Sequence, residues 1–217
     1  MPPYTSGAAL ALVLLAGLLW ASRREDHRLV LSFKAPLSAL FVLAALLQPH
    51  PDTAYFYLVL AGLVLGLVGD VLLALPGQAS FRAGLFAFLL GHLAYLPAFA
   101  GLAGAGHWLH PWLLAFPLAS LAVFLWLRPR LGGMLVPVAL YILVITAMTL
   151  AAGAAFSALA PPANWCILAG ATAFYLSDLL VARQRFASPG FINRLLGLPL
   201  YYGGQFLIAF SVGMVGG

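Results

Sequence analysis

Apolar residues run through this chain in long stretches that short polar gaps separate. A helix that crosses the hydrocarbon core of a bilayer needs about 20 mostly apolar residues. Eight stretches come close to that length, so we predict an all-α membrane protein, a single domain over residues 1–217 that forms a bundle of eight transmembrane helices. The predicted spans are 7–21, 29–47, 54–75, 81–100, 108–127, 133–152, 163–182 and 195–215.

Composition supports this class. Hydrophobic residues make up 64% of the chain and charged residues only 7%, whereas a soluble domain carries about 25% charged residues. The gaps contain sequences typical of turns, such as Pro-Gly-Gln, Arg-Pro-Arg and Ala-Pro-Pro-Ala. The single cysteine, Cys166, excludes an internal disulfide and a cysteine-based metal cluster. The net charge of +5 does not indicate a nucleic-acid partner, because the basic residues are spread over these short gaps.

The basic residues lie in alternate gaps or just inside the spans that border them. If the chain crosses the membrane eight times, all of them fall on one side, which the positive-inside rule identifies as cytoplasmic. Both termini then lie on the extracytoplasmic side. The residues concerned are Arg23, Arg24, Arg28, Lys34, Arg82, Arg128, Arg130, Arg183, Arg185 and Arg194.

Two of the five acidic residues, Asp70 and Asp178, lie inside predicted spans. An ionisable group in a membrane costs several kcal/mol and is a functional-site hypothesis by default. Both aspartates lie roughly 6–8 Å from the cytoplasmic ends of their helices, at 1.5 Å per residue. The other polar residues of the same half of the membrane are Lys34, Tyr201 and Tyr202 at similar depth and His92 and Gln205 nearer the midplane.

Helical spacing places these residues on inward faces. Gly62, Gly66 and Asp70 follow each other at intervals of four, and small residues at that spacing let helices approach closely. The corresponding sets on the other helices are Gly170, Phe174 and Asp178 with Tyr175, then Phe88, His92 and Tyr95, and finally Tyr201 and Gln205. We therefore expect a polar pocket beneath the cytoplasmic face.

Two interpretations of the aspartates remain open. In one, a carboxylate forms a buried ion pair with Lys34, Arg82 or Arg183 that only fixes helix packing. In the other, two carboxyls share a pocket and differ in protonation, which provides an acid and a base. His92 is either a packed core histidine or a member of the site. Two aspartates and one histidine could bind a metal ion, although their spacing does not require one.

The same residues carry a resemblance that spans almost the whole chain. The sequence resembles the lysoplasmalogenase family of YhhN-like membrane proteins. The second-helix motif of that family usually reads Lys-Pro, whereas this chain has Ala35 between Lys34 and Pro36. The matching motifs are Phe33-Lys34-Ala35-Pro36-Leu37, Gly69-Asp70, Gly91-His92 with Tyr95, Tyr141 with Met148, Ser177-Asp178, and Tyr201-Tyr202 with Gln205.

The resemblance implies hydrolysis of the vinyl ether bond of lysoplasmalogens, which yields a fatty aldehyde and glycerophosphoethanolamine or -choline. It implies a single-chain phospholipid substrate. The acid–base chemistry requires no cofactor, and the distribution of basic residues predicts an integral membrane protein, of the inner membrane in a bacterium, with the site toward the cytoplasmic leaflet. Acid cleaves vinyl ethers, so we predict that one aspartate is a protonated acid and the other is ionised. The predicted catalytic residues are Asp70, Asp178 and His92, and the predicted substrate-binding residues are Lys34, Arg82, Tyr95, Tyr141, Tyr175, Arg183, Tyr201, Tyr202 and Gln205.

Other classes of function remain open. A small lipid or solute transporter could use the two carboxyls as a proton relay, although the chain has no clear internal repeat. A binding or scaffold protein would have no evident use for buried carboxyls. The sequence does not indicate the oligomeric state.

Overall fold

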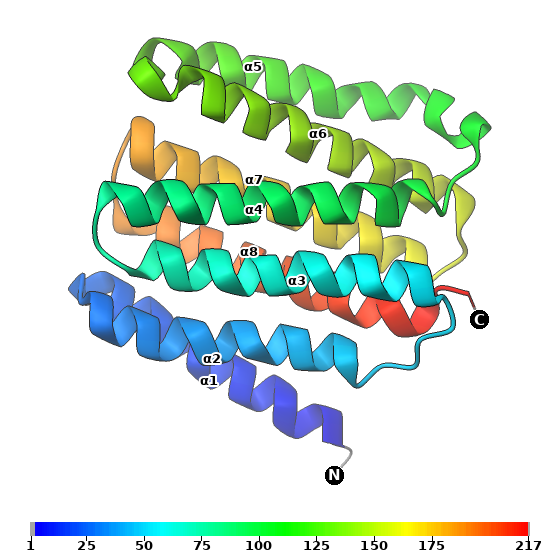
Figure 1. Cartoon of the computed structure of the whole chain (residues 1–217), viewed down its shortest axis with the longest axis horizontal. Coiled ribbons are helices and arrows are strands. Elements are labelled where there is room, and N and C mark those ends of the chain that lie inside the picture. Colours follow the sequence, from blue (N-terminus) through cyan, green and yellow to red (C-terminus); the bar gives the residue numbers. More distant parts are fainter. Residues whose placement is uncertain (1–2, 217) are drawn as a thin grey trace.

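The computed structural model describes residues 3–216, and the side chains of residues 7–216. These residues form eight α-helices and four short 3₁₀ turns, with no strand among them (Figure 1). The helices are α1 (Pro3–Arg24), α2 (His27–Leu46), α3 (Thr53–Ala74), α4 (Gln78–Ala100), α5 (Ala115–Leu131), α6 (Leu135–Ala158), α7 (Ala163–Phe186) and α8 (Phe191–Ser211).

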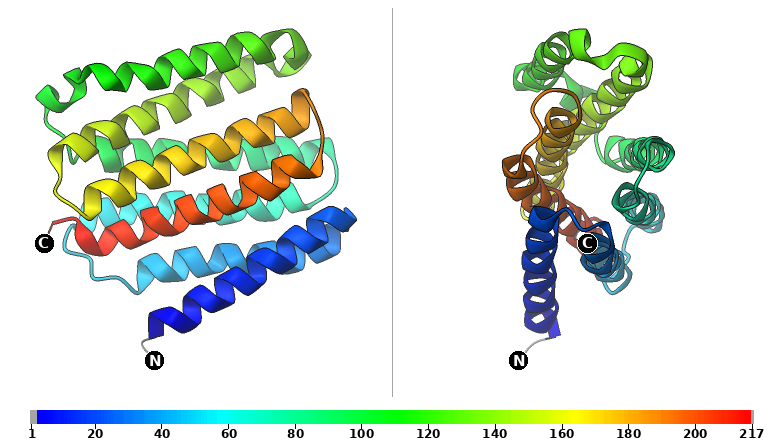
Figure 2. Two further views of the ribbon diagram at one scale, coloured as in Figure 1. Left: turned by 180° about the vertical axis from the view of Figure 1, so that it is seen from behind. Right: turned by 90° about the vertical axis from the view of Figure 1, so that its left-hand side faces the viewer.

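Six of the helices form a closed ring around a common interior. In order around the ring, α2, α3, α4, α6, α7 and α8 each pack against the next, and α8 packs back on α2. The two views from front and back show α3 and α4 in one layer and α7 and α8 in the other (Figures 1 and 2). Helix α1 packs outside on α2 and α8, and α5 packs outside on α6. The interior of the ring therefore receives one face of each of six helices.

The predicted all-α membrane class is confirmed. Within the described residues 3–216, seven segments are long and apolar enough to cross a membrane, and one of them, Pro111–Ala158, contains both α5 and α6. Large apolar side chains are exposed along the outside of the bundle, among them Leu12, Tyr57 and Leu143, as expected where lipid rather than water covers the surface. The chain is an integral membrane protein. The number of eight crossings and the sides of the termini stay predictions.

The predicted fifth span, 108–127, is wrong at both ends. Residues 105–114 form the 3₁₀ turns η1 (Ala105–Leu109) and η2 (Pro111–Leu114), and α5 begins only at Ala115. Pro111 disfavours helical backbone in the residue before it, and His110 is extended. At the other end the helix continues through Arg128-Pro129-Arg130, which we expected to be a turn, and ends at Leu131, just before Gly132, whose φ is +49°. Glycine adopts a positive φ without strain. The helix therefore ends before Gly132 and not at Pro129.

Helix α7 also extends beyond its predicted end at residue 182, to Phe186, so Asp178 lies further from the helix end than expected. The connections α1–α2, α3–α4, α5–α6 and α7–α8 all lie at one end of the bundle, and the basic residues lie in the helices near that end (Figure 1). Two of the remaining acidic residues cap helices: Asp26 accepts hydrogen bonds from backbone N–H groups at the start of α2, and Asp52 does the same for α3.

Candidate active site

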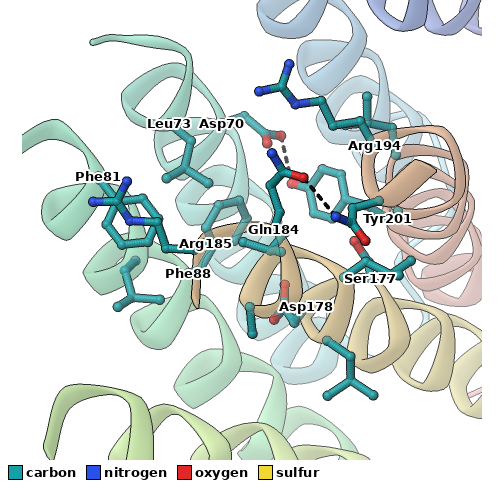
Figure 3. A pocket seen from close by; sticks show the side chains of 18 of the residues that line it. Asp70, Leu73, Phe81, Phe88, Ser177, Asp178, Gln184, Arg185, Arg194 and Tyr201 are labelled. Carbon is teal, nitrogen blue, oxygen red and sulfur yellow. Dashed lines mark hydrogen bonds between the residues drawn. The ribbon is translucent and has the colours of Figure 1, made fainter. Parts of the chain in front are cut away.

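A cavity of about 460 Å³ lies inside the ring, and all eight helices contribute to its lining. Both membrane aspartates, Asp70 and Asp178, line it (Figure 3). Its walls are otherwise mainly apolar, from residues such as Leu73, Phe88 and Ile145. The cavity reaches the basic end of the bundle, where its lining includes the exposed residues Glu25, His27 and Arg185 and the half-buried Arg194. An apolar pocket with a few convergent polar groups is typical of a small-molecule site.

Asp70, on α3, is held by three side chains. Lys34 Nζ lies 2.9 Å from its Oδ1, Ser38 Oγ lies 2.6 Å from its Oδ2, and the Tyr201 hydroxyl donates to the same Oδ2 at 2.7 Å. Its side chain is only 1% exposed. A buried carboxylate needs paired charge and hydrogen bonds, and this set of partners favours its ionised form.

Local geometry explains how α2 supplies two of these partners. Lys34 and Ser38 are one helical turn apart, so both face α3 and α8. Ser38 Oγ also lies 2.9 Å from the carbonyl oxygen of Lys34 and 3.1 Å from the Tyr202 hydroxyl. Lys34, Ser38 and Tyr202 therefore form a packed polar wall behind Asp70.

Asp178, on α7, has a different environment. The Tyr141 hydroxyl of α6 donates a hydrogen bond to Oδ2 at 2.7 Å, and His92 Nε2 of α4 lies 3.6 Å from the same oxygen. Among residues 3–216, no lysine or arginine lies within 4.0 Å of this carboxyl. Its side chain is 18% exposed, toward the cavity. The two aspartates thus share one cavity but differ in charge compensation.

His92 is 1% exposed, and neither ring nitrogen has a hydrogen-bond partner. Its ring packs against Phe174 at a centroid distance of 4.6 Å and against Tyr141 at 5.2 Å. A buried histidine without partners is unusual, and its position beside Asp178 makes it a candidate for positioning that carboxyl. Among residues 3–216, Asp70, Asp178 and His92 do not form a group that could hold one metal ion.

A chain of hydrogen bonds extends from Asp70 toward the bundle interior. Gln205 Nε2 donates to the Tyr201 hydroxyl at 3.3 Å, and the Tyr95 hydroxyl donates to Gln205 Oε1 at 2.8 Å. Gly66 makes room for this chain, because an added Cβ there would lie 2.7 Å from Gln205 Nε2. The inward faces expected from helical spacing are present.

The predicted substrate-binding residues separate into two groups. Lys34, Tyr141, Tyr175 and Tyr201 line the cavity, although the Tyr175 hydroxyl is engaged with Ser120 Oγ at 2.9 Å. The remaining five, which do not line the cavity, are Arg82, Tyr95, Arg183, Tyr202 and Gln205.

Both predicted arginines lie away from the cavity for local reasons. Arg82 is exposed on α4, and Arg183, in the last turn of α7, donates to Asn193 Oδ1 of α8 at 2.9 Å. The arginines that line the cavity are instead Arg185 and Arg194. The prediction also missed Ser38, which its position one turn after Lys34 could have indicated.

Comparison with known proteins gives consistent matches over most of the chain. The family model of the YhhN family matches residues 29–212. Lysoplasmalogenase TMEM86A from Bos taurus is 33% identical over 179 residues, which cover 79% of this chain and 72% of the bovine protein.

Lysoplasmalogenases from Mycobacterium bovis and Mycobacterium tuberculosis are each 31% identical over 177 residues, which cover 79% of this chain. The matched region spans 64% of these mycobacterial proteins, which is less than two thirds of their length. No solved structure matches the chain.

Proposed function

The chain belongs to the YhhN family, and from this premise we propose that it is a lysoplasmalogenase, a membrane hydrolase that cleaves the vinyl ether bond of lysoplasmalogens. The family predicted from the sequence motifs is confirmed. The relatives named above give no support to the transporter alternative. The observation that carries the proposed chemistry is the pair of carboxyls in one cavity with unequal partners.

The first step needs a proton donor. Asp178 has a hydroxyl and a histidine as neighbours but no lysine or arginine, so the neutral acid suits it better than the anion. It donates its proton to the vinyl carbon that is β to the ether oxygen. The double bond electrons form the new C–H bond, and the α carbon and oxygen become an oxocarbenium ion beside the Asp178 carboxylate.

Asp70 presents the negative end of its fixed ion pair with Lys34 to this cation. Both of its oxygens are already engaged by Lys34, Ser38 and Tyr201, so it acts through its field and does not need to accept a proton. Charge that is oriented before reaction and shielded from water stabilises a developing charge of opposite sign strongly.

The second step consumes water. Water attacks the α carbon while the Asp178 carboxylate takes its proton, which gives a hemiacetal and restores the acid. The hemiacetal hydroxyl then loses a proton, the bond from the α carbon to the ether oxygen breaks, and that oxygen gains a proton. The products are a fatty aldehyde and glycerophosphoethanolamine or -choline, and atoms balance with one water consumed.

Access follows from the shape of the cavity. We assign the hydrocarbon tail to its apolar walls and the head group to the basic end of the bundle. By the positive-inside rule that end faces the cytoplasm, so the substrate would come from the cytoplasmic leaflet, which in a bacterium belongs to the inner membrane.

The test uses the carboxamide variants Asp70→Asn and Asp178→Asn in purified protein, with aldehyde release from a lysoplasmalogen as the readout. Asp178→Asn should lose about 10²–10⁴-fold in kcat, as expected for a general acid. Asp52→Asn is the matched control, because it makes the same change outside the cavity and asparagine caps a helix as well as aspartate. Full activity in folded Asp178→Asn would exclude it as the acid, and no aldehyde from the unmodified enzyme would refute the function.

Isotope labelling tests which carbon receives the proton and which carbon–oxygen bond breaks. In D₂O the aldehyde should carry one deuterium at carbon 2, because the proton added to carbon exchanges with solvent through Asp178. In H₂¹⁸O the glycerophospho product should contain no ¹⁸O, because the ether oxygen stays with glycerol. Mass spectrometry of both products gives the result, and ¹⁸O in the glycerol product would contradict the mechanism.

A further inference from the structure

Two arginines at the open end of the cavity carry charge that no carboxylate matches. Arg185 lies near the end of α7 and Arg194 in the first turn of α8, and both line the cavity (Figure 3). Among residues 3–216 the ion pairs within 4.0 Å are Lys34–Asp70 and His92–Asp178, so neither arginine has an acidic partner there. Lys34 is deeper and already neutralised by Asp70.

Each arginine is held by one contact that leaves most of its donors free. The Arg185 guanidinium lies over the Phe81 ring, 4.5 Å from the centroid, which is a cation–π contact and not a hydrogen bond. Arg194 donates one N–H to the carbonyl oxygen of Ser22 at 2.7 Å. A guanidinium has five donors in a planar fork that matches a phosphate.

An acidic residue lines the same end of the cavity. Glu25 joins α1 to α2 and is exposed, and within residues 3–216 it forms no ion pair. Its φ of +56° makes it the one described residue other than glycine with a positive φ. Helix ends with this conformation usually carry glycine, which adopts it without strain. Glu25 therefore occupies a position where a residue without a side chain is preferred.

We propose that Glu25, Arg185 and Arg194 form a head-group subsite, in which the arginines bind the phosphate of the lysolipid and Glu25 binds its terminal ammonium. This inference rests on the proposed function and adds to it the residues that recognise the phosphate and the ammonium of the head group. Two cations and one anion at one opening complement a group that carries one phosphate and one ammonium.

The experiment compares three substrates that share the same vinyl ether: alkenyl-glycerophosphoethanolamine, alkenyl-glycerophosphate and alkenylglycerol. The variants are Arg185→Gln, Arg194→Gln and Glu25→Gln. Arg128→Gln is the matched control, because Arg128 is exposed at the same end of the bundle but does not line the cavity. KM and kcat for each substrate are measured in detergent micelles, and thermal unfolding checks the fold.

Each arginine variant should raise KM for the two phosphate-bearing substrates by about tenfold or more, the value of a charged hydrogen bond, and leave alkenylglycerol unchanged. Glu25→Gln should raise KM for the ethanolamine substrate only, because alkenyl-glycerophosphate has no ammonium. Equal losses on all three substrates would show a structural role and overturn the subsite, as would variants that behave like Arg128→Gln. If the unmodified enzyme cleaves none of the three, the proposed function itself fails.

Discussion

Replacing Lys34 by glutamine removes the lysine that compensates the charge of Asp70. The carboxylate is 1% exposed and the lysine side chain 11%, so the pair is buried. Removing one member of a buried pair costs about 3–5 kcal/mol, because the other charge stays uncompensated. Ser38 and Tyr201 would still donate to Asp70, so we expect a value near 3 kcal/mol.

For a domain of this size that loss corresponds to a fall in Tm of about 6–12 °C. The assay is thermal unfolding in one detergent, followed by tryptophan fluorescence. The double variant Lys34→Gln/Asp70→Asn should recover much of the stability, because an amide pair carries no buried charge, and yet release little aldehyde. The reasoning is refuted if Lys34→Gln melts like the unmodified protein, or if the stability losses of the two single variants simply add in the double variant.

Two further changes test single contacts. Tyr141→Phe removes the hydroxyl that donates to Asp178 and should lower kcat about tenfold with an unchanged Tm, so an unaffected kcat would exclude a role for this contact. Gly204→Ala would place a Cβ 2.7 Å from the Gly170 carbonyl oxygen, between α7 and α8, and should lower Tm clearly, whereas Gly203→Ala meets nothing within 4 Å. Equal Tm values for the two alanine variants would contradict the packing argument.

Local patterns predicted much of the fold, because helix formation and inward faces depend on residues close in sequence. Apolar length located the helices, and the interval of four placed Asp70 and Phe174 correctly. The start of α5 was missed because 3₁₀ turns and a helix have similar composition. Its end was missed because Arg-Pro-Arg is typical of a turn, whereas the helix continues through Pro129, which removes one backbone donor without ending it.

The partners of the carboxyls were not predictable, since they depend on which helices become neighbours. Sequence named Lys34, Arg82 and Arg183 as equal candidates to pair with an aspartate, and only the ring of helices brings Lys34 to Asp70. Arg183 and Arg185 are two positions apart, which is about 200° around a helix. A small error in helix phase therefore exchanges Arg183, which donates to Asn193, for Arg185, which lines the cavity.

The pairing of Lys34 with Asp70 also bears on how the protein enters the membrane. The two residues belong to consecutive helices, α2 and α3, that pack against each other. A lone charge at the bilayer centre adds about 2.5–3.5 kcal/mol to the insertion of its helix. The cost is smaller near the end of a helix, where these two residues lie, but it applies to each charge alone, whereas the pair is neutral overall. Insertion of α2 and α3 together as a helical hairpin is therefore favoured over insertion one helix at a time, and the polar side chains of the site help to assemble the bundle before any substrate arrives.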